Sequence, residues 1–189
     1  MASPDDMVRA VSASMREHTG RSTEEWVAVV ADAGIDPIDQ KAVRSFLKSQ
    51  WSLPQNSQWA IADAAARAAG WLPPTVEEFI DAQFSGAKAA LRPIYDALAA
   101  VILGQGDDVQ AEGRSTYIPF VRKRQFAAIA AATRARVDLG LRFTDAPTSA
   151  RLIPSANFAQ ASHRVGLSSA AEVDEEVRRL IAIAYAQNG

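Results

Sequence analysis

The sequence contains no cysteine and only two histidines among its 189 residues. Without cysteine the chain cannot form a disulfide framework, a thiolate metal site or a cysteine-based redox centre, so a reducing cytoplasm is the expected compartment. His18 and His163 lie far apart in the sequence, and neither has a second ligand residue nearby. Because a metal site needs several converging ligands, we expect no metal ion and no other cofactor.

Long apolar runs are also absent. The longest runs extend over seven residues, as from Phe126 to Ala132, whereas a membrane-spanning helix needs roughly 20. Asp5 and Asp6 make the N-terminus acidic where a secretory signal is basic, and no apolar segment follows them. We therefore expect a protein that is neither exported nor embedded in a membrane.

The charge of the chain is unevenly distributed, although its net value is only −2. Residues 113–164 carry nine Arg and Lys side chains and two Asp side chains, whereas the rest of the chain carries 11 basic and 20 acidic ones. A locally basic segment is typical of a surface that binds an anionic partner. The acidic residues elsewhere argue against nonspecific coating of nucleic acid.

Residues 1–72 are predicted to form a small domain of four short helices. Polar residues that can cap a helix N-terminus precede the first three apolar patterns: Ser3, Ser22 and Asp36. Glu25 stands three residues after Ser22, which is the spacing of a capping box. A fourth helix is expected from about Gln55 to Ala69.

All four tryptophans belong to this region: Trp26, Trp51, Trp59 and Trp71. Four short helices need large side chains to bury enough apolar surface, so we interpret the tryptophans as core residues. The alternative is an aromatic groove for a partner around Trp51, which falls in a polar segment.

The best domain boundary is Pro73-Pro74, because two prolines stop one helix and Thr75 with Glu78 can cap the next. The second domain, residues 75–189, is predicted to contain helices over 75–103, strands over 115–168 and a C-terminal helix over 169–186. The fold class is therefore α+β, with an antiparallel sheet of about four strands packed on helices.

The strands are predicted from a change of hydrophobic period from about 3.6 to 2 after residue 113. Four segments show it: 116–121, 125–131, 136–143 and 161–168. Pro119 cannot donate a hydrogen bond to a neighbour, so its strand should lie at an edge or contain a bulge. Ser169 and Glu172 have capping-box spacing and predict the start of the last helix.

Several segments of the second domain carry a resemblance: Leu91 to Leu98, Thr116 to Ala127, Val137 to Leu141 and Ser162 to Leu167. They are similar to an uncharacterised bacterial domain of unknown function, which would cover about Ser85 to the C-terminus. That domain also occurs at the end of predicted transport proteins and of proteins with restriction-endonuclease-like parts. The first 70 residues resemble a second, helical domain of unknown function that is often joined to it. The resemblance implies a two-domain bacterial protein in the cytosol, and it offers no activity or functional residue.

No set of residues typical of catalysis stands out in the sequence. A nucleophile elbow of the form G-x-S-x-G is missing, and Gly104-Gln105-Gly106 lacks the strand–loop–helix context of a phosphate loop. His163 falls on the apolar face of its strand, which favours a half-buried structural histidine. An enzyme that uses His163 with a nearby Ser or Asp stays open as a third hypothesis.

Arginines on the polar face of the predicted sheet are the main binding candidates. Arg136, Arg142 and Arg164 alternate with apolar residues, and guanidinium groups can grip a carboxylate or a phosphate. Tyr117, on the first strand, is included among the candidate ligand-binding residues. The leading hypothesis is a non-enzymatic binding protein for an anionic small molecule or an acidic protein partner. The alternative is a solvated sheet face without a ligand.

A second hypothesis is a nucleic-acid-binding accessory protein. The predicted hairpin tip Arg122-Lys123-Arg124 projects three cations, and Arg142 should return to the same end of the sheet. Other arginines should lie at the opposite end: Arg114, Arg134 and Arg136. This division of the positive charge weakens the nucleic-acid hypothesis.

Overall fold

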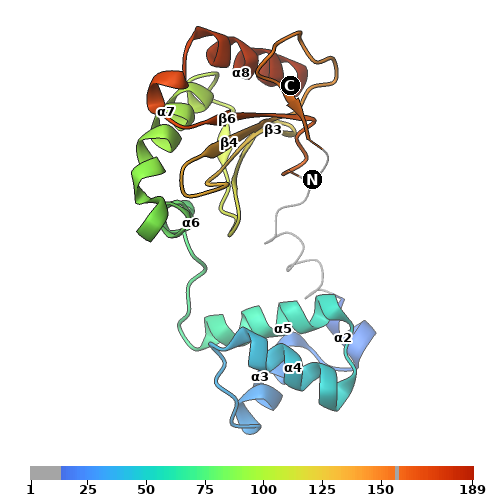
Figure 1. Ribbon diagram of the computed structural model, residues 1–189. Helices are drawn as coiled ribbons and strands as arrows, with labels where there is room; N and C mark the ends of the chain where they lie inside the picture. The colour runs from blue at the N-terminus through green and yellow to red at the C-terminus, as the bar shows by residue number, and fades with distance from the viewer. Residues whose placement is uncertain (1–13, 156–157) are drawn as a thin grey trace. The chain divides into compact units, whose positions relative to one another are not determined.

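The computed structural model describes residues 14–155 and 158–189. The chain divides into two compact units, residues 1–73 and 74–189, which are described separately. The described part of the first unit is helical, and the second combines helices with one antiparallel sheet (Figure 1). This mixture of helices and antiparallel strands agrees with the predicted fold class.

The helices among the described residues of the first unit are α2 (Met15–Thr19), α3 (Thr23–Asp32), α4 (Gln40–Trp51) and α5 (Gln55–Ala68). The predicted start at Ser3 lies outside the described residues. The predicted capping box is present, because the Ser22 hydroxyl accepts from the Glu25 amide and the Glu25 carboxylate accepts from the Ser22 amide. The predicted cap at Asp36 is wrong. Residues 36–39 form a turn, and the Asp39 side chain caps α4 by accepting from the Ala42 amide at 2.9 Å.

The core of the first unit contains Trp26 and aliphatic residues from all four helices, including Met15, Val30, Leu47 and Ile61. The prediction that the tryptophans are core residues is wrong for Trp51 and Trp59, whose exposed fractions are 44% and 46%. Trp71 is half-buried and is not part of the core, so only Trp26 fits the prediction. Cations cover part of these two rings. The Arg21 guanidinium lies 4.5 Å from the Trp51 ring centroid, and that of Arg44 lies 3.6 Å from the Trp59 centroid.

The second unit begins with three helices, α6 (Val76–Gln83), the 3-10 helix η1 (Gly86–Leu91) and α7 (Arg92–Leu103). Six strands follow: β1 (Gln110–Ala111), β2 (Ile118–Val121), β3 (Gln125–Ala130), β4 (Val137–Leu141), β5 (Ile153–Pro154) and β6 (His163–Leu167). Their order in the sheet is β1-β2-β3-β4-β6-β5, and every neighbouring pair is antiparallel. The prediction of about four strands missed β1 and β5, because two-residue strands are too short to show alternation.

The strand that contains Pro119 has the predicted irregularity. The pairing register of β2 with β3 shifts between Phe120 and Val121, and β1 continues the sheet beyond β2. Pro119 itself stays in register with Ala128, and its carbonyl accepts from the Glu112 amide. Its missing N–H therefore faces the side of the short edge strand β1, where no donor to β3 is lost.

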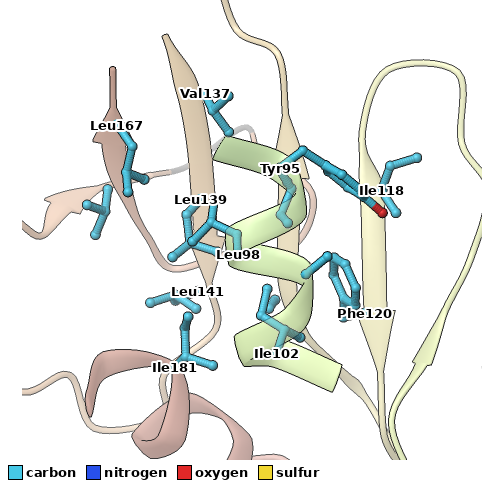
Figure 2. Packing of buried hydrophobic residues seen from close by; sticks show 14 of the residues in the cluster. Tyr95, Leu98, Ile102, Ile118, Phe120, Val137, Leu139, Leu141, Leu167 and Ile181 are labelled. Atoms are coloured by element: carbon cyan, nitrogen blue, oxygen red, sulfur yellow. The ribbon is translucent and has the colours of Figure 1, made fainter. Parts of the chain in front are cut away.

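One face of the sheet packs on the helices and forms the core of the second unit. Figure 2 shows Leu98 and Ile102 of α7 reaching the strands, with Leu139 and Leu141 of β4 beside them. Ile181 joins them from the C-terminal helix α8 (Glu175–Gln187). The opposite face of the central strands carries small residues and one acid, and the side chains of Ala128, Ala130 and Asp138 on it are buried.

The predicted start of the last helix at Ser169 is wrong. Ala170–Glu172 forms a separate 3-10 turn, η2, and the Glu172 carboxylate accepts from the Ser168 amide at 2.7 Å. The Asp174 side chain caps α8 instead, by accepting from the Val177 amide at 3.1 Å. The acid is thus placed three residues before the amide that it satisfies, as in other N-caps.

Candidate functional site

A cleft of ≈ 580 Å³ lies on the sheet face opposite the helices. Its walls come from the segment before β2, the end of β3, the middle of β4 and β6, and the segment after β5. The lining residues are Thr116, Tyr117, Ala130, Ala131, Ala132, Asp138, Pro154, Ser155, Phe158, Ala159 and Arg164. A volume of this size is typical of sites for small molecules.

The strand register explains why polar side chains meet at this cleft. Leu139 pairs with Val165, and both are buried on the helix-covered face. Because side chains alternate along a strand, the neighbours Asp138 and Arg164 point to the other face. Asp138 is also paired with Ala130, which brings the end of β3 to the same place.

Asp138 joins two of the predicted arginines. Its carboxylate accepts from the Arg136 Nε at 2.8 Å and from the Arg164 Nη1 at 3.1 Å. The carboxylate side chain is only 11% exposed, whereas those of Arg136 and Arg164 are 42% and 28% exposed. Two guanidinium groups therefore share one carboxylate, and the cluster keeps one net positive charge.

Gly166 allows this cluster to form. A Cβ atom at Gly166 would come within 3.0 Å of the Arg136 Cδ, so the arginine stem crosses the strand where no side chain stands. A glycine within a strand permits such close approach of a neighbouring group.

Two aromatic rings form the apolar part of the cleft. The ring centroids of Tyr117 and Phe158 are 6.2 Å apart, and the rings meet edge to face at 75°. This geometry is favourable for an aromatic pair and leaves ring surface available to a ligand. Tyr117, a candidate from the sequence, thus shares the cleft with Arg164.

Arg142 is not among the lining residues, and its Nη1 lies 3.4 Å from the Gln160 Oε1. Of the predicted residues, Arg164 and Tyr117 line the cleft. Arg136 does not line it and is connected to it through Asp138, whereas Arg142 lies outside it. Sequence reasoning missed Asp138 and Phe158 as site residues. Asp138 had a signal, since it is one of two acids in the basic segment and falls within a predicted strand.

A family model described as "Domain of unknown function (DUF5655)" matches residues 80–188. The chain belongs to this family. No curated protein and no solved structure matches the chain. The match covers most of the second unit and includes every residue that lines the cleft, so the cleft lies within the DUF5655 domain of this chain.

The predicted nucleic-acid tip lies in the turn between β2 and β3 of the DUF5655 domain. The Arg122 guanidinium donates to the Asp108 carboxylate and lies 4.2 Å from the Tyr185 ring centroid. The hydrogen bond from Arg122 lowers the pKa of Asp108, and the bond from the Tyr185 hydroxyl to Asp108 raises the pKa of Tyr185. Only Lys123 and Arg124 of the three cations are exposed.

His163 in the DUF5655 domain is half-buried, as expected. Its Nδ1 lies 3.0 Å from the Ser162 Oγ, and its ring meets that of Phe143 edge to face. Within residues 14–155 and 158–189, no group of three His, Asp or Glu side chains is arranged to hold a metal ion. The same residues contain no helix with the length and apolarity to cross a bilayer.

Proposed function

We propose that the DUF5655 domain of this chain is a binding module for a small anionic molecule that carries an aromatic or other planar group. The observation that carries the proposal is the Asp138 carboxylate in the lining of the cleft, which is shared by Arg164, also a lining residue, and by Arg136, which does not line the cleft. An anionic ligand meets the unbalanced positive charge there, and a guanidinium presents several donors in a fixed plane. The rings of Tyr117 and Phe158 hold the planar part.

The size of the cleft favours a small molecule over an acidic protein as ligand. A stable protein interface buries about 800 Å² on each partner, whereas this site is a hollow bordered by the strands and by the chain after β5. The lining combines apolar surface with a few converging polar groups, which is the usual composition of a small-molecule site.

The proposal includes a two-domain organisation, with residues 1–72 and 75–189 as separate domains. It is supported by the compact units 1–73 and 74–189 and by the family match, which begins at residue 80.

Isothermal titration calorimetry with three probes tests the proposal. Phenyl phosphate should bind more tightly than inorganic phosphate, because its ring adds contact with the aromatic wall, and neutral benzyl alcohol should bind most weakly. Arg164→Gln should weaken phenyl phosphate binding about tenfold, the effect of losing a charged hydrogen bond of roughly 1.4 kcal/mol. Arg136 remains paired with Asp138 in this variant, so the carboxylate keeps a partner.

The matched control is Arg142→Gln, which removes the same charge from the same domain outside the cleft. It should leave the affinity within about twofold, since exposed distant charges are screened by salt. Equal affinities for the wild type and Arg164→Gln, or no binding of phenyl phosphate, would contradict the proposal.

A further inference from the structure

Helix α4 carries three cations in a stretch of sequence without acidic residues. The sequence from Gln40 to Ala62 contains no Asp or Glu but includes Lys41, Arg44 and Lys48. Within the described ranges 14–155 and 158–189, none of these three cations forms an ion pair, whereas Arg16 and Arg67 of the same unit do. The positive charge on α4 is therefore available to a partner.

The three cations lie along one side of the helix. Positions 41, 44, 48 and 51 follow the spacing of three and four residues that places side chains on one helical stripe. Trp51 is thus aligned with Lys41, Arg44 and Lys48, and Lys41, Lys48 and Trp51 are exposed. Lys41 and Lys48 are separated by about 10 Å along the axis, since the rise is about 1.5 Å per residue.

Arg44 connects this stripe to α5. Its guanidinium stacks on the half-exposed Trp59 ring, and its Nε donates to the Gln40 carbonyl at 3.1 Å. The stack orients the indole beside the cations. We call the set Lys41, Arg44, Lys48, Trp51 and Trp59 the α4 surface.

The acids closest in sequence to the α4 surface are engaged elsewhere. Asp63 pairs with Arg67 at 2.7 Å, and Asp39 accepts from the Ala42 amide as the cap of α4. Neither is paired with a cation of the α4 surface. An anionic partner would therefore meet three cations whose charge is not already compensated.

We propose that the helical unit binds single-stranded nucleic acid through the α4 surface. The cations contact phosphates, and the exposed indoles of Trp51 and Trp59 stack on bases, which is the combination found in proteins that bind single strands. A duplex hides its base faces from such rings. A lipid surface would require a continuous apolar face, but the exposed side of α4 also carries Ser45, Ser49 and Gln50.

The proposal is tested with the full-length chain and a fluorescein-labelled thymidine oligonucleotide of about 20 nucleotides, longer than the site of one small domain. Fluorescence anisotropy at low salt should detect binding, and quenching of tryptophan fluorescence should accompany it. All four tryptophans lie within residues 26–71, so the quenching reports on the helical unit alone. With three phosphate contacts, the logarithm of the affinity should fall against the logarithm of the salt concentration with a slope of about −2.

A pair of charge reversals separates the α4 surface from other cations. Lys41→Glu with Lys48→Glu should weaken binding at least tenfold, since each reversal replaces a phosphate contact by repulsion. Lys123→Glu with Arg124→Glu changes the net charge equally at exposed positions of the other unit, and should leave the affinity within about twofold. Circular dichroism of both variants establishes that helicity is retained.

A third pair of variants tests the stacking. Trp59→Ala should weaken binding about tenfold, and Trp59→Phe should recover most of the affinity, because a phenyl ring still stacks. The proposal is overturned if the oligonucleotide does not bind at low salt, if the two double reversals weaken it equally, or if a duplex of the same length binds more tightly. Equal affinities for Trp59→Ala and Trp59→Phe would also overturn it.

Discussion

The ring of Phe158 occupies the space where Gly140 has no side chain, and a Cβ atom at Gly140 would come within 2.7 Å of that ring. Phe158 can approach β4 this closely only because position 140 is glycine. The position of one wall of the cleft therefore depends on a residue in the middle of a strand.

Gly140→Ala should destabilise the DUF5655 domain by about 1–3 kcal/mol, because overpacking forces the ring or the strand to move. Urea denaturation measures this loss. In a Phe158→Ala background, Gly140→Ala should cost less stability. Part of the cost should remain, because the new Cβ atom would also lie 2.9 Å from the Ala161 Cβ. A penalty that is the same with and without Phe158 would show that the ring does not occupy this space.

Asp138→Asn should have opposite effects on stability and on anion binding. The variant loses a charged acceptor shared by Arg136 and Arg164, and we expect a loss of about 1 kcal/mol, since the half-exposed arginines are screened by water. The cleft gains one unit of positive charge, so the affinity for phenyl phosphate should rise several-fold. Calorimetry beside urea denaturation checks both, and weaker anion binding by a folded variant would argue against the cleft as an anion site.

The contacts of Asp108 predict a pH dependence of stability. The pKa of this carboxyl is lowered in the folded protein by the bonds from Arg122 and Tyr185. A group with a lowered pKa stabilises the fold fully above its ordinary pKa, and the contribution is lost as the pH falls through the folded value. Stability should therefore decrease on acidification from neutral to about pH 3.

Asp108→Asn isolates this contribution from those of the other carboxyl groups. The variant should be less stable than the wild type near neutral pH. The difference should be smaller near pH 3, below the ordinary aspartate pKa of about 3.9, because the unfolded chain takes up a proton there more readily than folded Asp108, whose pKa is lowered. Urea denaturation at both pH values gives the comparison. A difference of the same size at both would mean that the charge of Asp108 contributes nothing.

The start of α8 gives a matched pair of cap variants. Asp174→Ala should lower the melting temperature, because the Val177 amide loses its acceptor and Arg151 loses its ion-pair partner. Ser169→Ala should leave it nearly unchanged, since the Ser169 side chain makes no capping bond. Differential scanning calorimetry compares the two melting temperatures. A larger decrease for Ser169→Ala than for Asp174→Ala would mean that Ser169 caps the helix, as the sequence predicted.

Local patterns of the sequence were sufficient where the stabilising contact is also local. The capping boxes at Ser22 and Thr75 were predicted correctly, because both partners lie on one helical turn. The same spacing failed at Ser169, where Glu172 contacts Ser168 and the helix begins after Asp174. Spacing alone does not decide between neighbouring caps that compete for the same turn.

The candidate site was only partly predictable because it depends on pairing between distant strands. Alternation along the strands placed Arg136 and Arg164 on the same face of the sheet. That both arginines contact Asp138 depends on the register of β4 with β6, which the sequence does not show. The exposure of Trp51 and Trp59 also could not be derived from burial tendencies, since a large aromatic residue on a short helix is usually in the core.

The order of the strands has a consequence for how the domain assembles. The chain leaves β4 at Leu141, forms the edge strand β5 and then returns, so that β6 enters between β5 and β4. Strands β2, β3 and β4 are joined by short turns and can pair with little loss of chain entropy. Pairing of β4 with β6 requires closure of a long loop, which costs more chain entropy. Arg164 reaches Asp138 only through the pairing of β4 with β6, so we expect the cleft to be completed late in folding.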